Sequence, residues 1–190
     1  MFPIETFQTT LAKFSVILSE LDIRFHLTGG LTGTAYGEPR MTQNIDVVID
    51  PIQTQRHVNA FVIKIDESDF MFAEDAMRGA IASGDLFQLL DQTECLKLDI
   101  YPREMIPGEL DRSELLEFFE GEMIPVVSRI DAAASKLVWI KKGSHKNRRD
   151  LRAIFRNCNE DQQDAVRTQA RELELGELLQ QVLQEPDELQ

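Results

Sequence analysis

The chain has 190 residues, of which 33 are acidic and 20 are basic, so its formal net charge is −13. This charge argues against a protein that coats duplex DNA or docks on an anionic membrane, because both partners require a broad basic face. No apolar run approaches the ~20 residues of a transmembrane helix. The first five residues lack the pattern of a signal peptide, and two cysteines make no disulfide framework. We therefore expect a cytoplasmic protein that has no membrane contact.

The predicted elements begin with an amphipathic helix over residues 4–21, where apolar residues recur in steps of three and four. A short β-prone segment at 24–28 leads into a glycine pair, and a β-branched strand at 45–49 ends at Asp50-Pro51. Further elements are expected before residue 128: helices at 53–66, 73–83 and 112–120, a hairpin of strands 85–90 and 95–101, and a strand at 123–127.

Beyond Ser128 the sequence predicts helices throughout. Ser128 and Asp131 form a capping-box pattern, and the tail from residue 161 is acidic and rich in glutamine. We expect an α+β fold in which a mixed sheet flanked by helices (1–128) precedes a helical segment packed on it (129–190). One side of the last helix carries a row of leucines that either packs on the chain's own domain or binds a protein partner: Leu175, Leu178, Leu179 and Leu183.

Glycines cluster after the first predicted strand, since four of the ten lie between Gly29 and Gly37. A glycine pair between a strand and a helix lets the backbone approach a phosphate and present N–H groups to it. The same pair is equally typical of a tight turn without a ligand.

Two carboxylates interrupt apolar strands. Asp46 shares one face of its strand with Asn44, and Asp99 has Lys97 and Tyr101 as same-face neighbours. Asp46 would otherwise reach solvent at a strand end, and Asp99 would otherwise form an ion pair with Lys97. If the two strands are adjacent, however, Asp46 and Asp99 meet, and two such oxygen ligands hold Mg²⁺ against a triphosphate.

Gly29-Gly30, a gap of thirteen residues and then Asn44-Ile45-Asp46 resemble the nucleotidyltransferase fold of the DNA polymerase beta superfamily. The segment from Thr28 to Asp50 looks most like the bacterial abortive-infection toxin type, known from toxin–antitoxin systems, and its small relatives. In those relatives a lysine on a helix and a basic-Asp pair on the next helix follow, and Lys136 and Arg149-Asp150 match them.

The resemblance implies that the protein binds NTP with Mg²⁺ or Mn²⁺ and transfers a nucleotidyl group to a hydroxyl of an RNA or protein acceptor. It makes Asn44, Asp46 and Asp99 the metal ligands, and Asp99 also the base. Lys136 and Asp150 would complete the catalytic set, with Asp150 orienting Lys136. The resemblance also implies five nucleotide-binding residues: Gly29, Gly30, Arg40, Thr42 and Lys136.

Asn44 departs from the resemblance, because it stands where the family has its first metal-binding aspartate. An amide oxygen carries no negative charge, so we expect it to be a weak ligand and metal binding to be reduced. The alternative is a catalytically weakened protein of the same fold that acts as a nucleotide-binding or partner-binding regulatory module.

Basic charge is concentrated between Lys136 and Arg156, which include eight Lys or Arg residues and one acidic residue, Asp150. Such an island suits a triphosphate or a short RNA end, or it is a solvated helix surface. We expect Lys141 and Lys142, at a helix end, to matter less than Lys136, and Trp139 to serve packing.

Overall fold

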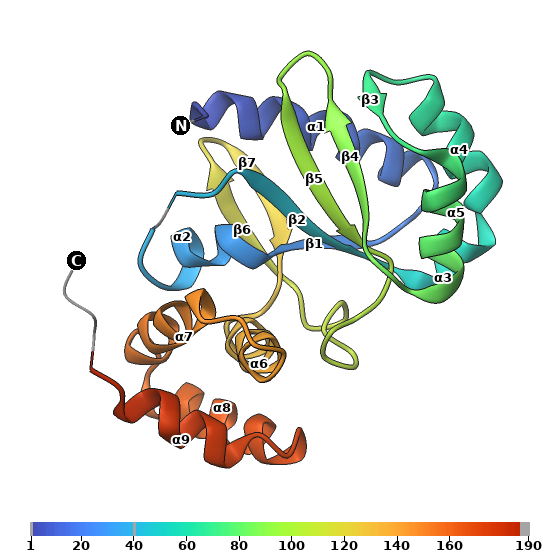
Figure 1. Cartoon of the computed structure of the whole chain (residues 1–190). Helices are drawn as coiled ribbons and strands as arrows, with labels where there is room; N and C mark the ends of the chain where they lie inside the picture. Colours follow the sequence, from blue (N-terminus) through green and yellow to red (C-terminus); the bar gives the residue numbers. More distant parts are fainter. Residues whose placement is uncertain (1, 40, 187–190) are drawn as a thin grey trace.

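The structure is a computed structural model that describes residues 2–39 and 41–186 (Figure 1). Its strands form one seven-stranded mixed sheet in the order β3-β4-β5-β2-β1-β7-β6. The strands are β1 (Phe25–Thr28), β2 (Asn44–Ile49), β3 (Phe70–Met71), β4 (Phe87–Asp91), β5 (Leu96–Tyr101), β6 (Glu114–Phe119) and β7 (Glu122–Val126). The helices are α1 (Ile4–Glu20), α2 (Thr32–Tyr36), α3 (Pro51–Arg56), α4 (Val58–Asp66), α5 (Glu74–Ser83), α6 (Arg129–Lys141), α7 (Lys146–Arg156), α8 (Glu160–Glu172) and α9 (Gly176–Gln184), with a 3₁₀ turn η1 (Gly29–Leu31).

The centre of the sheet combines both strand directions, which confirms the predicted mixed sheet. β2 pairs antiparallel with β1 and parallel with β5, and β1 pairs parallel with β7. β4 and β5 form the predicted hairpin, and β6 and β7 form a second one.

One part of the apolar core lies on the face of the sheet that α1 and α4 cover, and the core also includes residues of α6 to α9. Figure 1 shows α1 running behind the sheet, and the rings of Phe14 in α1 and Phe61 in α4 lie 6.3 Å apart. Ile45 and Val47 of β2 are fully buried in this core. Because side chains alternate along a strand, Asn44 and Asp46 lie on the opposite face of β2.

The helix predicted at 112–120 is wrong, since residues 114–119 form strand β6. Gly121 adopts a φ of +78° in the turn between β6 and β7, and Phe119 pairs with Glu122. This pairing overrides the local helix preference of a segment rich in Glu and Leu. The helix predicted at 53–66 begins earlier and divides at His57 into α3 and α4, and the Asp50 carboxylate caps α3.

After β7 the described residues up to 186 form helices, as predicted. Ser128 Oγ accepts a hydrogen bond from the Asp131 N–H at 3.1 Å, but the Asp131 carboxylate does not complete the capping box. It instead accepts hydrogen bonds from Ser128, from Arg112 ahead of β6 and from Gln169 in α8, and so ties three segments together.

The tail helices pack on the rest of the chain. Leu175 and Leu179, two of the four leucines on the predicted side, are buried, and Val182 is fully buried. The apolar side of α9 is therefore occupied, and a partner protein would have to use its polar side. The division near residue 128 into two parts stays a prediction. None of the helices within the described residues is long and apolar enough to cross a membrane.

Candidate functional site

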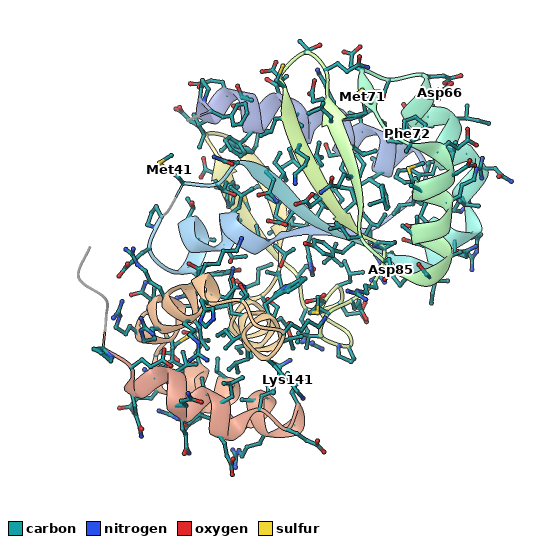
Figure 2. All side chains as sticks on the ribbon, in the orientation of Figure 1. Met41, Asp66, Met71, Phe72, Asp85 and Lys141 are labelled. Carbon is teal, nitrogen blue, oxygen red and sulfur yellow. The ribbon has the colours of Figure 1, made fainter. Side chains whose placement is uncertain are left out.

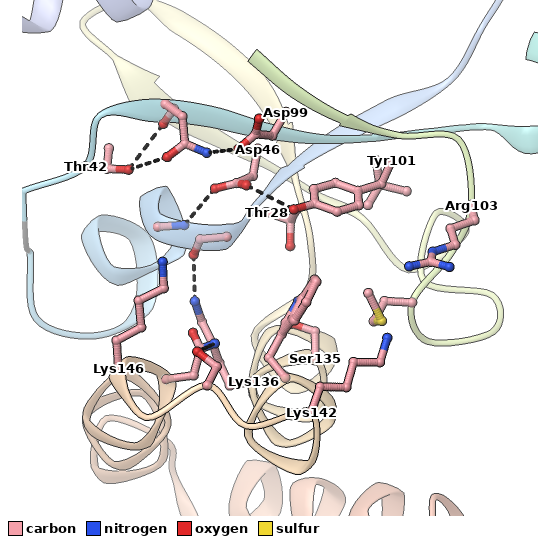
Figure 3. A pocket seen from close by; sticks show the side chains of 18 of the residues that line it. Thr28, Thr42, Asp46, Asp99, Tyr101, Arg103, Ser135, Lys136, Lys142 and Lys146 are labelled. Atoms are coloured by element: carbon pink, nitrogen blue, oxygen red, sulfur yellow. Dashed lines mark hydrogen bonds between the residues drawn. The ribbon is translucent and has the colours of Figure 1, made fainter. Parts of the chain in front are cut away.

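A pocket of about 540 Å³ lies between the sheet and the helices α6 and α7 (Figure 3). The end of β1, one face of β2 and β5 and the turn η1 form one wall, and α6 with the start of α7 forms the other. Five basic side chains and two aspartates line it, in a chain that is strongly acidic overall. The pocket thus suits an anionic ligand.

Asp46 and Asp99 occupy neighbouring positions on parallel strands. In the register of β2 and β5, Asp46 lies beside Asp99, and both line the pocket. The structure therefore brings together the two carboxylates that the sequence predicted to meet.

The glycine turn lies directly against Asp46. Gly29 has a φ of +65°, and a Cβ atom added to it would lie 2.1 Å from Oδ2 of Asp46. The N–H of Gly30 donates a hydrogen bond to the same oxygen at 3.3 Å. The close approach of Asp46, together with the positive φ, is the reason that a side chain at position 29 would disturb the carboxylate.

The surroundings of Asp46 disfavour its negative charge. Burial is the main cause that raises the pKa of Asp46, and the nearby charge of Asp99 raises it further, against the Gly30 hydrogen bond. The Tyr101 hydroxyl donates to Oδ1 of Asp46 at 3.4 Å, and burial and the two carboxylates raise the pKa of Tyr101. A bound cation would relieve this unfavourable environment.

Asp99 accepts hydrogen bonds from two side-chain amides. Asn44 Nδ2 donates to Oδ2 at 2.7 Å, and Gln88 Nε2 donates to Oδ1 at 2.9 Å. The Lys97 ammonium lies 3.2 Å from Oδ1. The Asn44 oxygen faces the Thr42 hydroxyl, which donates to it at 3.3 Å. Asn44 thus presents an N–H group to Asp99, not the oxygen that the resemblance assigned to it as a metal ligand.

The oxygen atoms of Asp46 and Asp99 fit one divalent cation, because the site has two carboxylates and not the three that the family pattern implies. Within residues 2–39 and 41–186, no group of three or more His, Cys, Asp and Glu residues is placed to hold a metal. A carboxylate offers about four lone-pair positions, so Asp46 and Asp99 retain acceptor positions beyond their present contacts. Mg²⁺ is commonly held by one or two carboxylates together with phosphate oxygens and water.

Lys136 connects the two walls of the pocket. Its ammonium donates to the Gly29 carbonyl at 2.8 Å and to Oδ2 of Asp150 at 3.2 Å, and the Lys136 side chain is 3% exposed. This geometry gives Lys136 a role in holding the glycine turn against α6 and α7. It also agrees with the expectation that Asp150 orients Lys136.

The arginines of α7 are engaged outside the pocket. Arg149 and Arg156 form ion pairs with Glu38, and Arg148 and Arg152 form ion pairs with Glu185. Half of the eight basic residues in the island predicted from the sequence therefore form ion pairs with Glu38 or Glu185. Lys136, Lys142 and Lys146 line the pocket from this segment.

Trp139 of α6 and Lys142, the residue directly after α6, both line the pocket. The Lys142 ammonium lies 5.1 Å from the ring centre of Trp139. That Lys142 matters less than Lys136 stays a prediction. Trp139 also lines the pocket and meets Tyr101 edge to face at 6.3 Å. Trp139 follows Lys136 by three positions, so the sequence alone indicated that both side chains lie on one face of a helix. Arg40 lies outside the described residues, and Thr42 lines the pocket.

No family model matches the sequence, and no curated protein matches it. Solved structures do. An antigenic nucleotidyltransferase-like protein from Paracoccidioides brasiliensis superposes with a TM-score of 0.52 at 17% identity, over 94% of each chain. The antibiotic-resistance factor ANT(2'')-Ia, described as having substrate-regulated conformation dynamics, superposes with a TM-score of 0.50 at 12% identity, over 95% of this chain and 91% of that one. Likeness at these identities is evidence of fold alone. The chain has the nucleotidyltransferase fold.

Proposed function

We propose that the protein binds a nucleoside triphosphate with Mg²⁺ or Mn²⁺ in this pocket and transfers a nucleotidyl group to a hydroxyl. The observation that carries the proposal is the Asp46–Asp99 pair beside the glycine turn, in a pocket lined by basic side chains. A triphosphate needs both features, since basic groups compensate its charge and carboxylates hold its cation.

The two aspartates take different roles. Asp46 is buried with a raised pKa, and a cation bound there would neutralise phosphate charge and polarise the bond to the leaving group. Asp99 would share this cation and lie beside the acceptor. The amides of Asn44 and Gln88 hold the Asp99 carboxylate in one orientation.

The basic residues at the mouth of the pocket would receive the phosphates. Lys142 and Lys146 approach from the helical wall and Arg103 from the segment after β5 (Figure 3). The partly exposed ring of Trp139 offers a surface on which a base can stack.

In the transfer, the acceptor oxygen forms a bond to the phosphorus of the α-phosphate. The bond from that phosphorus to the bridging oxygen breaks, and pyrophosphate leaves with the electron pair. The proton of the acceptor hydroxyl passes to Asp99, which is within the site as a general base.

A second candidate function is a nucleotide-binding or partner-binding regulatory module without transfer. The hydrogen bond from Asn44 to Asp99 favours it, because an N–H group occupies the place of a third carboxylate and lowers the negative charge available to cations.

One assay separates the two candidates. The protein is incubated with α-³²P-labelled NTPs, Mn²⁺ and a mixture of RNA and protein that supplies acceptor hydroxyls, and bound nucleotide and released pyrophosphate are measured separately. If the protein transfers a nucleotidyl group, wild type gives both signals and Asp46→Asn gives neither. Nucleotide binding without pyrophosphate release supports the regulatory module, and absence of nucleotide binding refutes both the transfer and a nucleotide-binding module. Asp164→Asn is the matched control, since the Asp164 side chain is 78% exposed and lies on α8.

A further inference from the structure

We propose that the acceptor is a protein, and that an apolar groove beside Asp99 binds the segment that carries the reacting hydroxyl. This proposal rests on the nucleotidyl transfer proposed above and names the acceptor class for the same site.

The groove lies over β3, β4 and the beginning of α5 and has a volume of about 680 Å³. Its lining is mainly apolar, with Met71, Phe72 and Leu86 among its residues. Met71 is 54% exposed and Leu86 is 40% exposed, so the groove displays uncovered apolar side chains. Figure 2 labels Met71 and Phe72 beside β3.

The groove and the nucleotide pocket adjoin at Lys97. In the β4–β5 hairpin, Gln88 lies opposite Asp99 and Leu90 lies opposite Lys97. Opposed residues of antiparallel strands project to the same face, and the hydrogen bond from Gln88 to Asp99 agrees with this. Lys97 lines both the pocket and the groove. A chain bound in the groove would therefore pass next to Asp99.

Charge distinguishes the groove from the pocket. Residues 66–94, which supply the groove apart from Lys97, include eight acidic residues and one basic residue, Arg78. Six of these acids are exposed: Asp66, Glu67, Asp69, Glu74, Asp75 and Asp85. The last three are each next in sequence to a residue that lines the groove.

An RNA acceptor would bring its phosphates against these acids, whereas the basic groups that such a backbone needs line the nucleotide pocket and, apart from Lys97, not the groove. A protein segment with apolar side chains and neighbouring Lys or Arg matches both the groove and its surroundings. A second copy of this chain fits less well, since two such grooves in a symmetric dimer would face each other with like charge.

The test uses three probes and two variants of the full chain. The probes are a synthetic peptide with one tyrosine among leucines and lysines, the same peptide with glutamates in place of the lysines, and a 12-nucleotide RNA with a free 3′ hydroxyl. Met71→Lys adds a positive charge inside the groove, which repels the lysines of the first peptide. Met123→Lys is the matched control, because Met123 is 58% exposed on β7, beyond β2 and β1 from the groove.

We expect the lysine peptide to bind wild-type protein at least tenfold more tightly than the glutamate peptide or the RNA. Met71→Lys should weaken that binding tenfold or more, and Met123→Lys should change it less than twofold. Label from α-³²P-NTP should pass to the tyrosine hydroxyl of the lysine peptide and not to the RNA.

The proposal is overturned if the RNA binds more tightly or is labelled, or if Met71→Lys leaves peptide binding unchanged. It is also overturned if sedimentation shows a dimer that Met71→Lys dissociates, since the groove would then bind a second copy. NTP binding by the same samples distinguishes failure of the protein-acceptor proposal from failure of the proposed function. Binding of Mn²⁺–NTP without peptide binding refutes the protein acceptor alone, whereas absence of NTP binding refutes the proposed function and the acceptor role with it.

Discussion

Asn44→Asp would restore the carboxylate that the sequence lacks, and its effect can be worked out from the contacts of Asn44. The side chain donates from Nδ2 to Oδ2 of Asp99 at 2.7 Å. The variant replaces this donor with an oxygen that repels Asp99. A hydrogen bond to a charged group contributes about 1.5–3 kcal/mol, and two unit charges ~4 Å apart repel by about 4 kcal/mol at an effective dielectric constant of ~20.

Proton uptake limits this cost. An aspartic acid at position 44 that binds a proton donates again to Asp99, and protonating a group of pKa ~4 costs about 4 kcal/mol at pH 7. We therefore expect a loss of about 3–4 kcal/mol at pH 7 that shrinks to about 1.5 kcal/mol at pH 5. The variant is less stable at higher pH because the pKa of the new carboxyl at position 44 is raised in the folded state. The stability that its protonated form contributes is present at low pH and is lost as the pH rises through that folded pKa.

Thermal melting with and without Mn²⁺ measures the effect. The melting temperature should fall by roughly 10 °C at pH 7, and Mn²⁺ at about 100 times its Kd should restore about 2.7 kcal/mol. Asn44→Ala is the control, because it removes the donor without adding charge and should gain no more from Mn²⁺ than wild type does. If Asn44→Asp melts like wild type at pH 7, or if Mn²⁺ stabilises it no more than wild type, the placement of Asn44 beside a cation site is refuted.

Three further variants test other contacts, each by urea unfolding. Gly29→Ala places its Cβ 2.1 Å from the Asp46 oxygen at a φ of +65°, so it should cost about 2 kcal/mol or more and weaken NTP binding; unchanged stability contradicts the close approach. Lys136→Met removes the cation beside buried Asp150 and should cost about 3–5 kcal/mol, part of which Lys136→Met with Asp150→Asn should recover; a purely surface lysine would show neither effect. Burial raises the pKa of Glu109 to about 7, so the stability its protonated form contributes is full below pH 4.5 and is lost as the pH rises through 7. Glu109→Gln should therefore be neutral at pH 5 and stabilising by about 2 kcal/mol at pH 8, and equal effects at both values would contradict the buried carboxyl.

Local pattern was enough to predict the elements that surround the site. The β-branched run ending at Asp50-Pro51 and the apolar run that includes Asp99 predicted β2 and β5, and alternation placed Asp46 on the polar face. The segment at 112–120 was mispredicted because Leu and Glu favour helix locally, whereas pairing with β7 is a long-range contact.

The contacts within the site depended on rotamers and on strands brought together from distant segments. Nothing in the local sequence indicates that Asn44 turns its N–H toward Asp99, or that Gln88 on the next strand shares that carboxylate. Likewise, the charge count from Lys136 to Arg156 did not predict that Glu38 and Glu185 would bind all four arginines of this segment. Charge totals along a sequence give no information on which side chains pair after folding.

The most direct test of the proposed function is a calorimetric titration of an NTP into wild type and Asp46→Asn, each with Mn²⁺ and with EDTA. Wild type should bind the NTP with Mn²⁺ at least tenfold more tightly than with EDTA, and Asp46→Asn should lose this difference. The variant should melt no lower than wild type at pH 7, because burial raises the pKa of Asp46 and its ionised form disfavours the fold as the pH rises through that pKa. Equal affinity in all four titrations, or no binding in any, would contradict a cation-dependent nucleotide site at Asp46.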